Sequence, residues 1–286
     1  MMKQKNAVII LTYTSPKQTL RLVNAMNNGD FDFYIHLDKK VDMKSHEEFD
    51  VYNNVFFIEE PIDIKWAGYS TTEAIIKSVK FIERSGNKYS YISLISGQDY
   101  PIKSAAYITQ FLKDNAGKEF INYRYFDEWT EAIERVEKYH LTEYQFRGQY
   151  LIQKAINGIL PKRKFPVDTK LCGKETFWTL TYECAIYTAH KIDSNKQLKR
   201  FLRYTWGCDE FIFQTIIMGS PFKKNVVNDN LRFINWPDGQ AARPNFFVSS
   251  DFERILASKA LFGRKFDIKL DEHILDLLDH EFSITF

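Results

Sequence analysis

The sequence predicts an α/β fold in which helices flank a mixed, mostly parallel sheet with a Rossmann-like first half. Short apolar runs alternate with amphipathic stretches through the first hundred residues, which is the order of strand and helix in successive βα units. The chain has 286 residues, of which 44% are hydrophobic and 27% charged, as in a globular protein with a sizeable core.

The first half of the chain is expected to hold four strands. The run at residues 7–13 is continuously apolar, which is typical of a central parallel strand, and Ser15 and Pro16 then begin a helix through residue 26. The next expected elements are strands at 33–38, 55–58 and 89–95 and helices at 71–85 and 103–115. Between them, residues 96–102 form a turn-forming loop with Asp99 at its tip.

The second half is expected to add shorter elements. They are strands at 120–125, 176–181 and 231–236, helices at 182–191, 252–258 and 272–278, and a turn at 237–239. Residues 126–166 are charged and aromatic, and we interpret them as an excursion from the sheet that shapes a substrate or partner surface. No long linker or repeat interrupts the sequence, which favours one domain over residues 1–286.

An acidic pair, Asp209 and Glu210, opens a strongly apolar segment that ends near residue 217. The apolar positions after the pair recur at helical spacing, which predicts a buried helix with both carboxylates in its first turn. One interpretation is structural, because Asp209 would cap this helix and Glu210 would support its first turn. The other is catalytic, since a carboxylate beside the small residues Gly207 and Cys208 is placed to act as a base.

Composition excludes several classes of function. A net charge of +2 does not indicate nucleic acid as a partner. Neither of the glycine-rich loops that cradle phosphates is present, which argues against dinucleotide-binding and P-loop proteins. Aromatic residues make up 16% of the chain; they indicate either a phenylalanine-rich core or stacking surfaces for sugar or nucleotide.

Cysteines and the N-terminal segment give no sign of a secreted protein. Cys172, Cys184 and Cys208 are odd in number and lack metal-ligand spacing, so neither a disulfide framework nor a zinc site is expected. The apolar run near the N-terminus is too short for a signal or membrane-spanning segment, and we expect a cytoplasmic protein. Asp30 and Asp32 form an Asp-x-Asp before the second strand, at its wrong end for a metal-diphosphate site.

Several segments, in order, carry a resemblance to a known family. They are His36-Leu-Asp-Lys-Lys40, Trp66-Ala-Gly-Tyr-Ser70, Ser96-Gly-Gln-Asp-Tyr-Pro-Ile-Lys103, Phe177-Trp-Thr-Leu-Thr-Tyr-Glu-Cys184, Asp209-Glu210, Phe233-Ile-Asn-Trp236 and Phe262-Gly-Arg-Lys-Phe-Asp267. Together they resemble the core-2/I-branching β-1,6-N-acetylglucosaminyltransferase and peptide O-xylosyltransferase family over about residues 7–270. Their number and order, more than any one motif, carry the resemblance.

The resemblance implies a GT-A-type fold and an inverting glycosyltransferase. Such an enzyme moves a sugar, N-acetylglucosamine or xylose, from a UDP-sugar to an acceptor hydroxyl without a metal or other cofactor. Residues 1–115 would form the UDP-binding half, and residues 116–286 the acceptor and catalytic half. The implied acceptor is a glycan or lipid-linked glycan, such as a surface or capsular glycan.

The resemblance also assigns roles to individual residues. Glu210 matches the catalytic base that deprotonates the acceptor hydroxyl. Asp38 matches the residue that contacts uridine, and Asp99 occupies the loop where other GT-A enzymes carry Asp-x-Asp. The remaining matches are Arg243 and Lys265 on the donor diphosphate, Trp236 near the sugar, and Arg135 at the acceptor.

Elementary chemistry agrees with these roles. An inverting transfer needs one carboxylate to take the proton of the incoming hydroxyl, as Glu210 would do. The departing diphosphate needs its developing charge stabilised, and without a metal Arg243 and Lys265 would supply fixed cations.

Two alternatives stay open beside the transferase. A glycoside hydrolase would use paired carboxylates, and a non-catalytic module would bind UDP or sugar without turnover. Vertebrate members of the resembled family carry a membrane anchor, a stem and disulfide cysteines that are absent here, which implies a soluble bacterial-type relative. Peripheral contact with the inner face of a membrane remains open.

Overall fold

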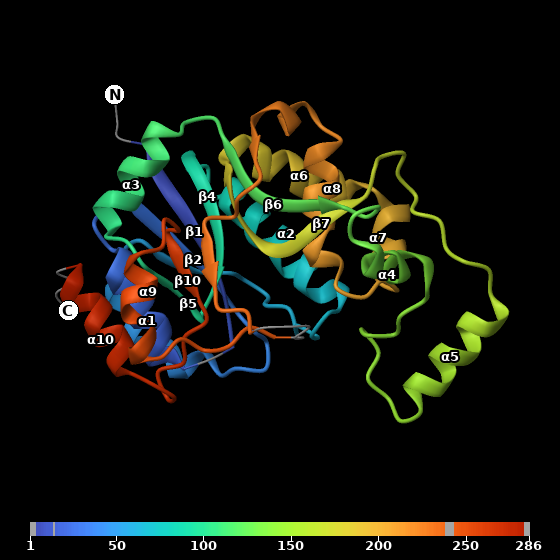
Figure 1. Cartoon of the computed structure of the whole chain (residues 1–286), viewed down its shortest axis with the longest axis horizontal. Helices are drawn as coiled ribbons and strands as arrows, with labels where there is room; N and C mark the ends of the chain where they lie inside the picture. The colour runs from blue at the N-terminus through green and yellow to red at the C-terminus, as the bar shows by residue number, and fades with distance from the viewer. Residues whose placement is uncertain (1–3, 14, 238–242, 283–286) are drawn as a thin grey trace.

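The computed structural model describes residues 4–13, 15–237 and 243–282, and shows a central sheet with helices on both faces (Figure 1). Within these residues, seven strands form the main sheet in the order β3-β2-β1-β4-β7-β6-β8, and a smaller sheet has the order β5-β10-β9.

The bounds of the elements follow the chain. The strands of the main sheet are β1 (Lys5–Thr12), β2 (Phe31–Leu37), β3 (Val55–Phe57), β4 (Tyr89–Ser96), β6 (Glu119–Tyr125), β7 (Cys172–Thr181) and β8 (Val226–Val227). The small sheet contains β5 (Asp99–Pro101), β9 (Arg232–Ile234) and β10 (Phe262–Arg264). The helices are α1 (Pro16–Met26), α2 (Tyr69–Arg84), α3 (Ala105–Asp114), α4 (Ile133–Glu137), α5 (Gln149–Ile159), α6 (Tyr182–Ser194), α7 (Lys196–Leu202), α8 (Ile212–Met218), α9 (Phe252–Leu256) and α10 (His273–Glu281).

The first half of the sheet is Rossmann-like. Strands β3, β2, β1 and β4 pair in parallel in that order, with helices in the connections. Strand β7 then pairs antiparallel with both β4 and β6, whereas β8 pairs parallel with β6. The predicted fold class is therefore confirmed, because the sheet is mixed, mostly parallel and flanked by helices.

Strand β1 is central because its apolar run is buried on both faces. Ala7 and Ile9 pack into a core that includes side chains of α2, α6 and α8. Val8 and Ile10 point the other way, into a core that includes side chains of α1, α3 and α10. Alternate residues of a strand face opposite sides, so one continuous apolar run serves two layers of helices.

Most expected elements are present with shifted ends. The seven elements expected before residue 116 all occur, whereas the strand expected at 176–181 is longer, because β7 begins at Cys172. The strand expected at 231–236 is shorter, and helix α7 was not expected. The turn predicted at 237–239 lies mainly outside the described residues, which stop at Pro237 and resume at Arg243.

The prediction that Asp99 lies at the tip of a loop is wrong. Asp99 begins β5, which pairs antiparallel with β10, and its side chain is fully buried. Its carboxylate accepts hydrogen bonds from the backbone N–H of Ser96 and from Arg264 Nη1, the latter at 3.3 Å. Residues 99–101, which were expected to form part of a loop, instead pair with β10 in the small sheet.

The prediction of an acidic pair in the first turn of a helix is also wrong. Cys208–Glu210 forms a single 3₁₀ turn that follows Gly207, whose φ of 59° lies in the left-handed region. Phe211, with φ of −140°, separates this turn from α8. Asp209 does not cap α8, because its Oδ2 instead accepts the hydroxyl hydrogen of Thr176 at 2.7 Å.

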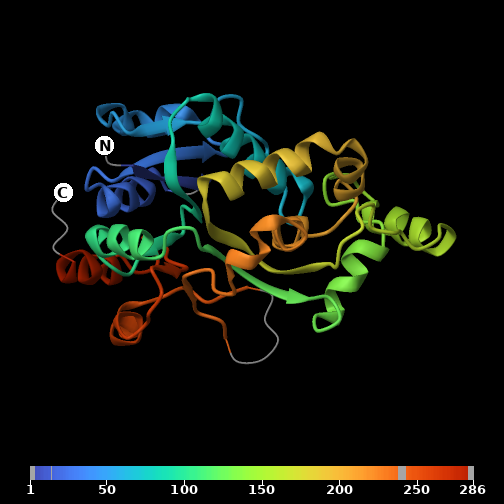
Figure 2. The same ribbon diagram turned by 90° about the horizontal axis from the view of Figure 1, so that it is seen from above.

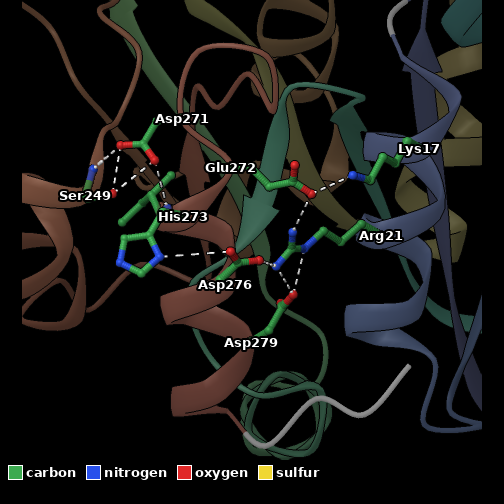
Figure 3. Close-up of polar contacts among 9 residues, drawn as sticks. Lys17, Arg21, Ser249, Asp271, Glu272, His273, Asp276 and Asp279 are labelled. Atoms are coloured by element: carbon green, nitrogen blue, oxygen red, sulfur yellow. Dashed lines mark hydrogen bonds and ion pairs between the residues drawn. The ribbon is translucent and has the colours of Figure 1, made fainter.

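The last helix, α10, is fastened to α1 by a network of ions (Figure 3). Arg21 on α1 donates from Nε to Asp279 at 2.7 Å and from Nη2 to Asp276 at 2.6 Å. The Tyr100 hydroxyl donates to the other oxygen of Asp279 at 2.5 Å. These contacts join the end of the chain to the first βα unit.

We predict that Arg21→Met lowers the free energy of unfolding by about 3–5 kcal/mol, because Asp279 is 5% exposed and would lose its cation inside the protein. Lys17→Met is the matched control, since Lys17 pairs with Glu272 at 2.7 Å at the surface and should change that free energy by less than about 1 kcal/mol. Urea unfolding measures both, and equal effects would contradict the structural role of Arg21.

Candidate active site

Glu210 presents an accessible carboxylate beside a guanidinium. Its side chain is 34% exposed, and Arg135 Nη1 on α4 donates a hydrogen bond to its Oε2. Within the described part of the chain, the second oxygen, Oε1, has no hydrogen-bond partner. This oxygen is free to receive a proton.

Arg135 is held between two indole rings. Its Cζ lies 4.6 Å from the ring centre of Trp129 and 4.3 Å from that of Trp206. A guanidinium stacks well on such rings through cation–π attraction, which is stronger where water is excluded. Arg135 is thus fixed in place, and it fixes Glu210 in turn.

A glycine sets the position of the acidic turn. A Cβ at Gly173 on β7 would lie 2.3 Å from Phe211 Cβ and 2.4 Å from the Glu210 carbonyl oxygen, distances that side chains do not tolerate. Only glycine lets the strand approach the turn this closely. On its other side, the turn is tied to the 65–68 loop by a hydrogen bond from Gly207 N–H to the Ala67 carbonyl at 2.7 Å.

Two further acids lie near Glu210, and both are less accessible. Burial raises the pKa of Asp209 to about 6, the Glu210 charge adds to this, and the Thr176 hydrogen bond opposes it. Burial also raises the pKa of Glu175, which accepts a hydrogen bond from Asn230. Of the two members of the acidic pair, Glu210 is therefore the one placed to meet a substrate.

Three basic residues gather near the end of β10. Burial lowers the pKa of Lys265, and the positive charges of Arg264 and Arg243 lower it further. Lys265 therefore lies close enough to both arginines to be repelled by them, while the Asp267 charge opposes this effect. Lys265 Nζ also lies 4.2 Å from the ring centre of Phe246. Such a concentration of positive charge is a site for an anion.

Trp66 connects the basic residues to the acidic turn. Arg243 Cζ lies 5.6 Å from its ring centre, and the Trp66 and Trp206 rings meet edge to face at 5.5 Å. Trp206 in turn stacks on the guanidinium of Arg135, which contacts Glu210. Trp66 is 65% exposed, so the aromatic row has a free surface between the cations and Glu210.

Asp38 lies where β2 ends, as predicted, but its oxygens already have partners. Its Oδ1 accepts the Lys40 N–H at 3.0 Å and its Oδ2 the Ile64 N–H at 3.3 Å. Nearby, His36 Nε2 accepts the Ile62 N–H at 2.9 Å, and burial lowers the His36 pKa to about 4, so the ring is neutral at pH 7. Asp38 therefore holds the 62–64 segment along the carboxyl edge of the sheet, where ligands bind in such folds.

The structure brings the sequence-predicted residues together in part. Glu210 and Arg135 are in contact, and Arg243 and Lys265 are neighbours. Trp236 is 49% exposed and follows β9, whose pairing places Ile234 beside Arg264.

Sequence reasoning gave no role to some residues of the site. They are Trp129, Trp206 and Gly173. Trp206 lies three residues before Asp209. Its position next to the acidic pair was the one feature of the sequence that could have indicated its role. Trp129 and Gly173 depend on contacts between segments far apart in the chain, which no local pattern reveals.

Two features are absent from residues 4–13, 15–237 and 243–282, the part of the chain that the structure describes. No group of three or more His, Cys, Asp or Glu side chains there is arranged to hold a metal ion. In the same residues, no helix has the length and apolar character needed to cross a bilayer. The three cysteines are buried and unpaired.

Comparisons with known proteins agree with the geometry. The family model described as "Branch: Core-2/I-Branching enzyme" matches residues 7–256. Xylosyltransferase 2 of Rattus norvegicus is 25% identical over 291 residues, and Xylosyltransferase 1 of Pan troglodytes is 24% identical over 293. These matches cover 92% and 96% of this chain but 32% and 30% of the relatives, so the chain spans about a third of their length.

Among solved structures, the crystal structure of mouse Xyloside xylosyltransferase 1 in its apo form is similar with a TM-score of 0.39 and 10% identity. The match covers 91% of this chain and 96% of that one.

We predict that Gly173→Ala destabilises the protein by about 1–3 kcal/mol, because the added methyl must push the acidic turn away from β7. Gly158→Ala on α5 is the matched control: among the described residues no heavy atom lies within 4 Å of its added Cβ, and the change should stabilise by up to about 1 kcal/mol. Thermal melting compares the two. A Gly173→Ala protein as stable as wild type would show that the turn is not constrained there.

Proposed function

The chain belongs to the Core-2/I-Branching enzyme family, and on that premise we propose that it is a glycosyltransferase with a nucleotide-sugar donor. The GT-A-type fold implied by the sequence agrees with this membership and with the mixed sheet. The observation that carries the proposal is the pairing of an accessible base, Glu210 beside Arg135, with a basic cluster reached through Trp66 and Trp206.

The donor we propose is a UDP-sugar, and xylose is the first sugar to test. The matched relatives are named xylosyltransferases, which favours xylose over N-acetylglucosamine. The acceptor is a hydroxyl group on a glycan, a lipid-linked glycan or a protein.

Glu210 would act as the general base of an inverting transfer. As the acceptor oxygen forms a bond to the anomeric carbon, its proton passes to Glu210 Oε1, while Arg135 holds Oε2. The bond between the anomeric carbon and the β-phosphate oxygen breaks on the opposite face, and its electron pair stays with UDP. One carboxylate is enough for this step, so Asp209 can remain buried.

Arg243 and Lys265 would stabilise the charge that develops on UDP, so that no metal is needed. Fixed cations aimed at a leaving phosphate need no reorganisation during the reaction, which makes them effective. Arg264 reinforces the same field and is itself fixed by Asp99 and Ser96. Asp99 would thus contribute to donor binding through Arg264, without touching the donor.

The remaining residues would shape the ends of the substrate site. Asp38 and the 62–64 segment that it holds would meet the uridine at the carboxyl edge of the sheet. Exposed indoles such as Trp66 and Trp236 offer flat apolar faces to a sugar ring.

We predict that Glu210→Gln lowers turnover by roughly 10²–10⁴-fold with UDP affinity nearly unchanged, because the amide can accept the acceptor hydrogen bond but not its proton. Glu134→Gln is the matched control, as Glu134 is an exposed carboxylate on α4 that pairs with Lys138 at 2.7 Å. UDP release with UDP-xylose and UDP-N-acetylglucosamine measures turnover, and calorimetry measures UDP affinity. Full turnover in a folded Glu210→Gln protein would exclude Glu210 as the base.

The same assays separate the two alternative functions. Enzymatic sugar release without UDP binding would favour a glycoside hydrolase, and UDP binding without turnover would favour a binding module.

We predict that turnover survives excess EDTA, and that Arg243→Ala and Lys265→Ala each reduce it by roughly 10²-fold or more, since each removes a preorganised charge from the leaving group. Lys269→Ala, at an exposed lysine four residues beyond Lys265, should leave turnover unchanged. Strict dependence on Mn²⁺, or full activity in the Arg243→Ala, Lys265→Ala double variant, would show that the diphosphate binds elsewhere.

A further inference from the structure

Helix α5 projects from the body of the protein and has no buried residue. It lies at the right-hand edge of Figure 1, and Figure 2 shows the same yellow-green helix at the edge from above. A helix is normally stabilised by packing its apolar face on the core. Since α5 does not do this, another explanation is needed for its sequence.

The side of α5 that faces the protein is polar. Gln149 Nε2 donates to the Leu141 carbonyl at 2.7 Å, and Gln153 Oε1 accepts the Leu141 N–H at 2.9 Å. Asn157 both accepts the Tyr139 N–H and donates to the Tyr139 carbonyl, at 2.7 and 2.8 Å. These residues, spaced four apart, attach α5 to the neighbouring segment through amide hydrogen bonds.

The opposite side of α5 is apolar and faces solvent. Leu151 is 70% exposed, Ile152 is 47% exposed and Ile159 is 82% exposed. Leu151, Ala155 and Ile159 are spaced by four residues and so form one stripe along the helix. An ordinary surface helix turns its apolar side to the protein and its polar side to solvent, and α5 does the reverse. Contiguous apolar surface of this kind marks an interaction site.

The segment of the chain that contains this stripe carries charges of one sign. Residues 144–167 contain Arg147, Lys154, Lys162, Arg163 and Lys164 but no Asp or Glu. Arg163 is bound within the protein, because its guanidinium donates hydrogen bonds to the carbonyls of Phe201 and Tyr204. The other four cations are exposed, beside or beyond the apolar stripe, and of these Lys162 pairs with Glu137 at 2.6 Å.

A basic pocket lies at the base of this excursion. It has a volume of about 380 Å³ and is lined by Tyr144, Lys196, Lys199, Arg200, Arg203 and Tyr204. Tyr144 belongs to the same acid-free stretch as α5, and its ring stacks on Tyr204 at 5.8 Å. Lys199 pairs with Asp193 at 2.7 Å, whereas in the described part of the chain the other three cations have no carboxylate within 4.0 Å.

We propose that the outer face of α5, with the exposed cations of residues 147–164 and the basic pocket, docks on the surface of an anionic lipid bilayer. An apolar stripe flanked by Lys and Arg is the pattern of helices that lie in the membrane interface. At 11 residues α5 is only about 16 Å long, so it lies in the interface without crossing the bilayer. The pocket, with its unpaired cations, receives a lipid phosphate.

Sedimentation of the whole protein with vesicles tests this docking independently of any transfer activity. We expect binding to mixed phosphatidylcholine–phosphatidylglycerol vesicles, weaker binding at high salt, and little binding to pure phosphatidylcholine. Leu151→Gln with Ile159→Gln should weaken the binding at least about tenfold, because both side chains lose their apolar contact with lipid. Leu270→Gln, at a leucine 60% exposed on another surface, is the matched control and should bind as wild type does.

Charge variants test the electrostatic part. Lys154→Ala and Lys164→Ala should each weaken binding about fivefold, and Arg200→Ala with Arg203→Ala should weaken it further. All of these variants should keep wild-type UDP release from soluble substrates, so failure of the docking and failure of the proposed transferase are separable. Equal binding by wild type and the Leu151→Gln, Ile159→Gln variant would overturn the proposal, as would equal binding to both kinds of vesicle. A dimer in light scattering that this variant abolishes, with no vesicle binding, would show instead that α5 joins two copies of the chain.

Discussion

The contact between Arg135 and Glu210 is the interaction on which the candidate site depends. It joins the 126–166 excursion to the turn between α7 and α8, and it is rigid because two tryptophans enclose the guanidinium. Gly173 fixes the turn from behind by letting β7 approach its backbone. The Glu210 carboxylate and its turn are thus positioned by contacts from the excursion and from β7.

The contact between Arg135 and Glu210 also links the acidic part of the site to its basic part. Trp206 stacks on Arg135 and meets Trp66, whose ring lies near Arg243. Carboxylate and cations are therefore separated by aromatic surface, which keeps Arg243 and Lys265 from being neutralised by Glu210. Helices α4 and α5 belong to the same excursion, so the segment proposed to dock on a bilayer is also the segment that carries Arg135.

The sequence predicted the parts of this molecule that depend on local patterns. The apolar run of β1, the Ser15 and Pro16 start of α1 and the carboxyl-edge position of Asp38 are local features, and the structure agrees with each. The resemblance to a family, carried by motifs in order, was confirmed by the family match. Asp99 was misplaced because its strand partner, β10, lies about 160 residues away, and helical spacing around Glu210 concealed a 3₁₀ turn that Gly207 and Gly173 impose. Trp129 was missed for the same reason, since it acts through its contact with Arg135.

The stereochemistry of the product tests the central claim most directly. Nuclear magnetic resonance of the sugar first formed from a UDP-sugar, recorded before its anomers equilibrate, reports which face of the anomeric carbon was attacked. A single base at Glu210, opposite the leaving diphosphate, predicts that the first product has the anomeric configuration opposite to that of the donor. A first product that retains the donor's configuration would contradict this arrangement of Glu210, Arg243 and Lys265.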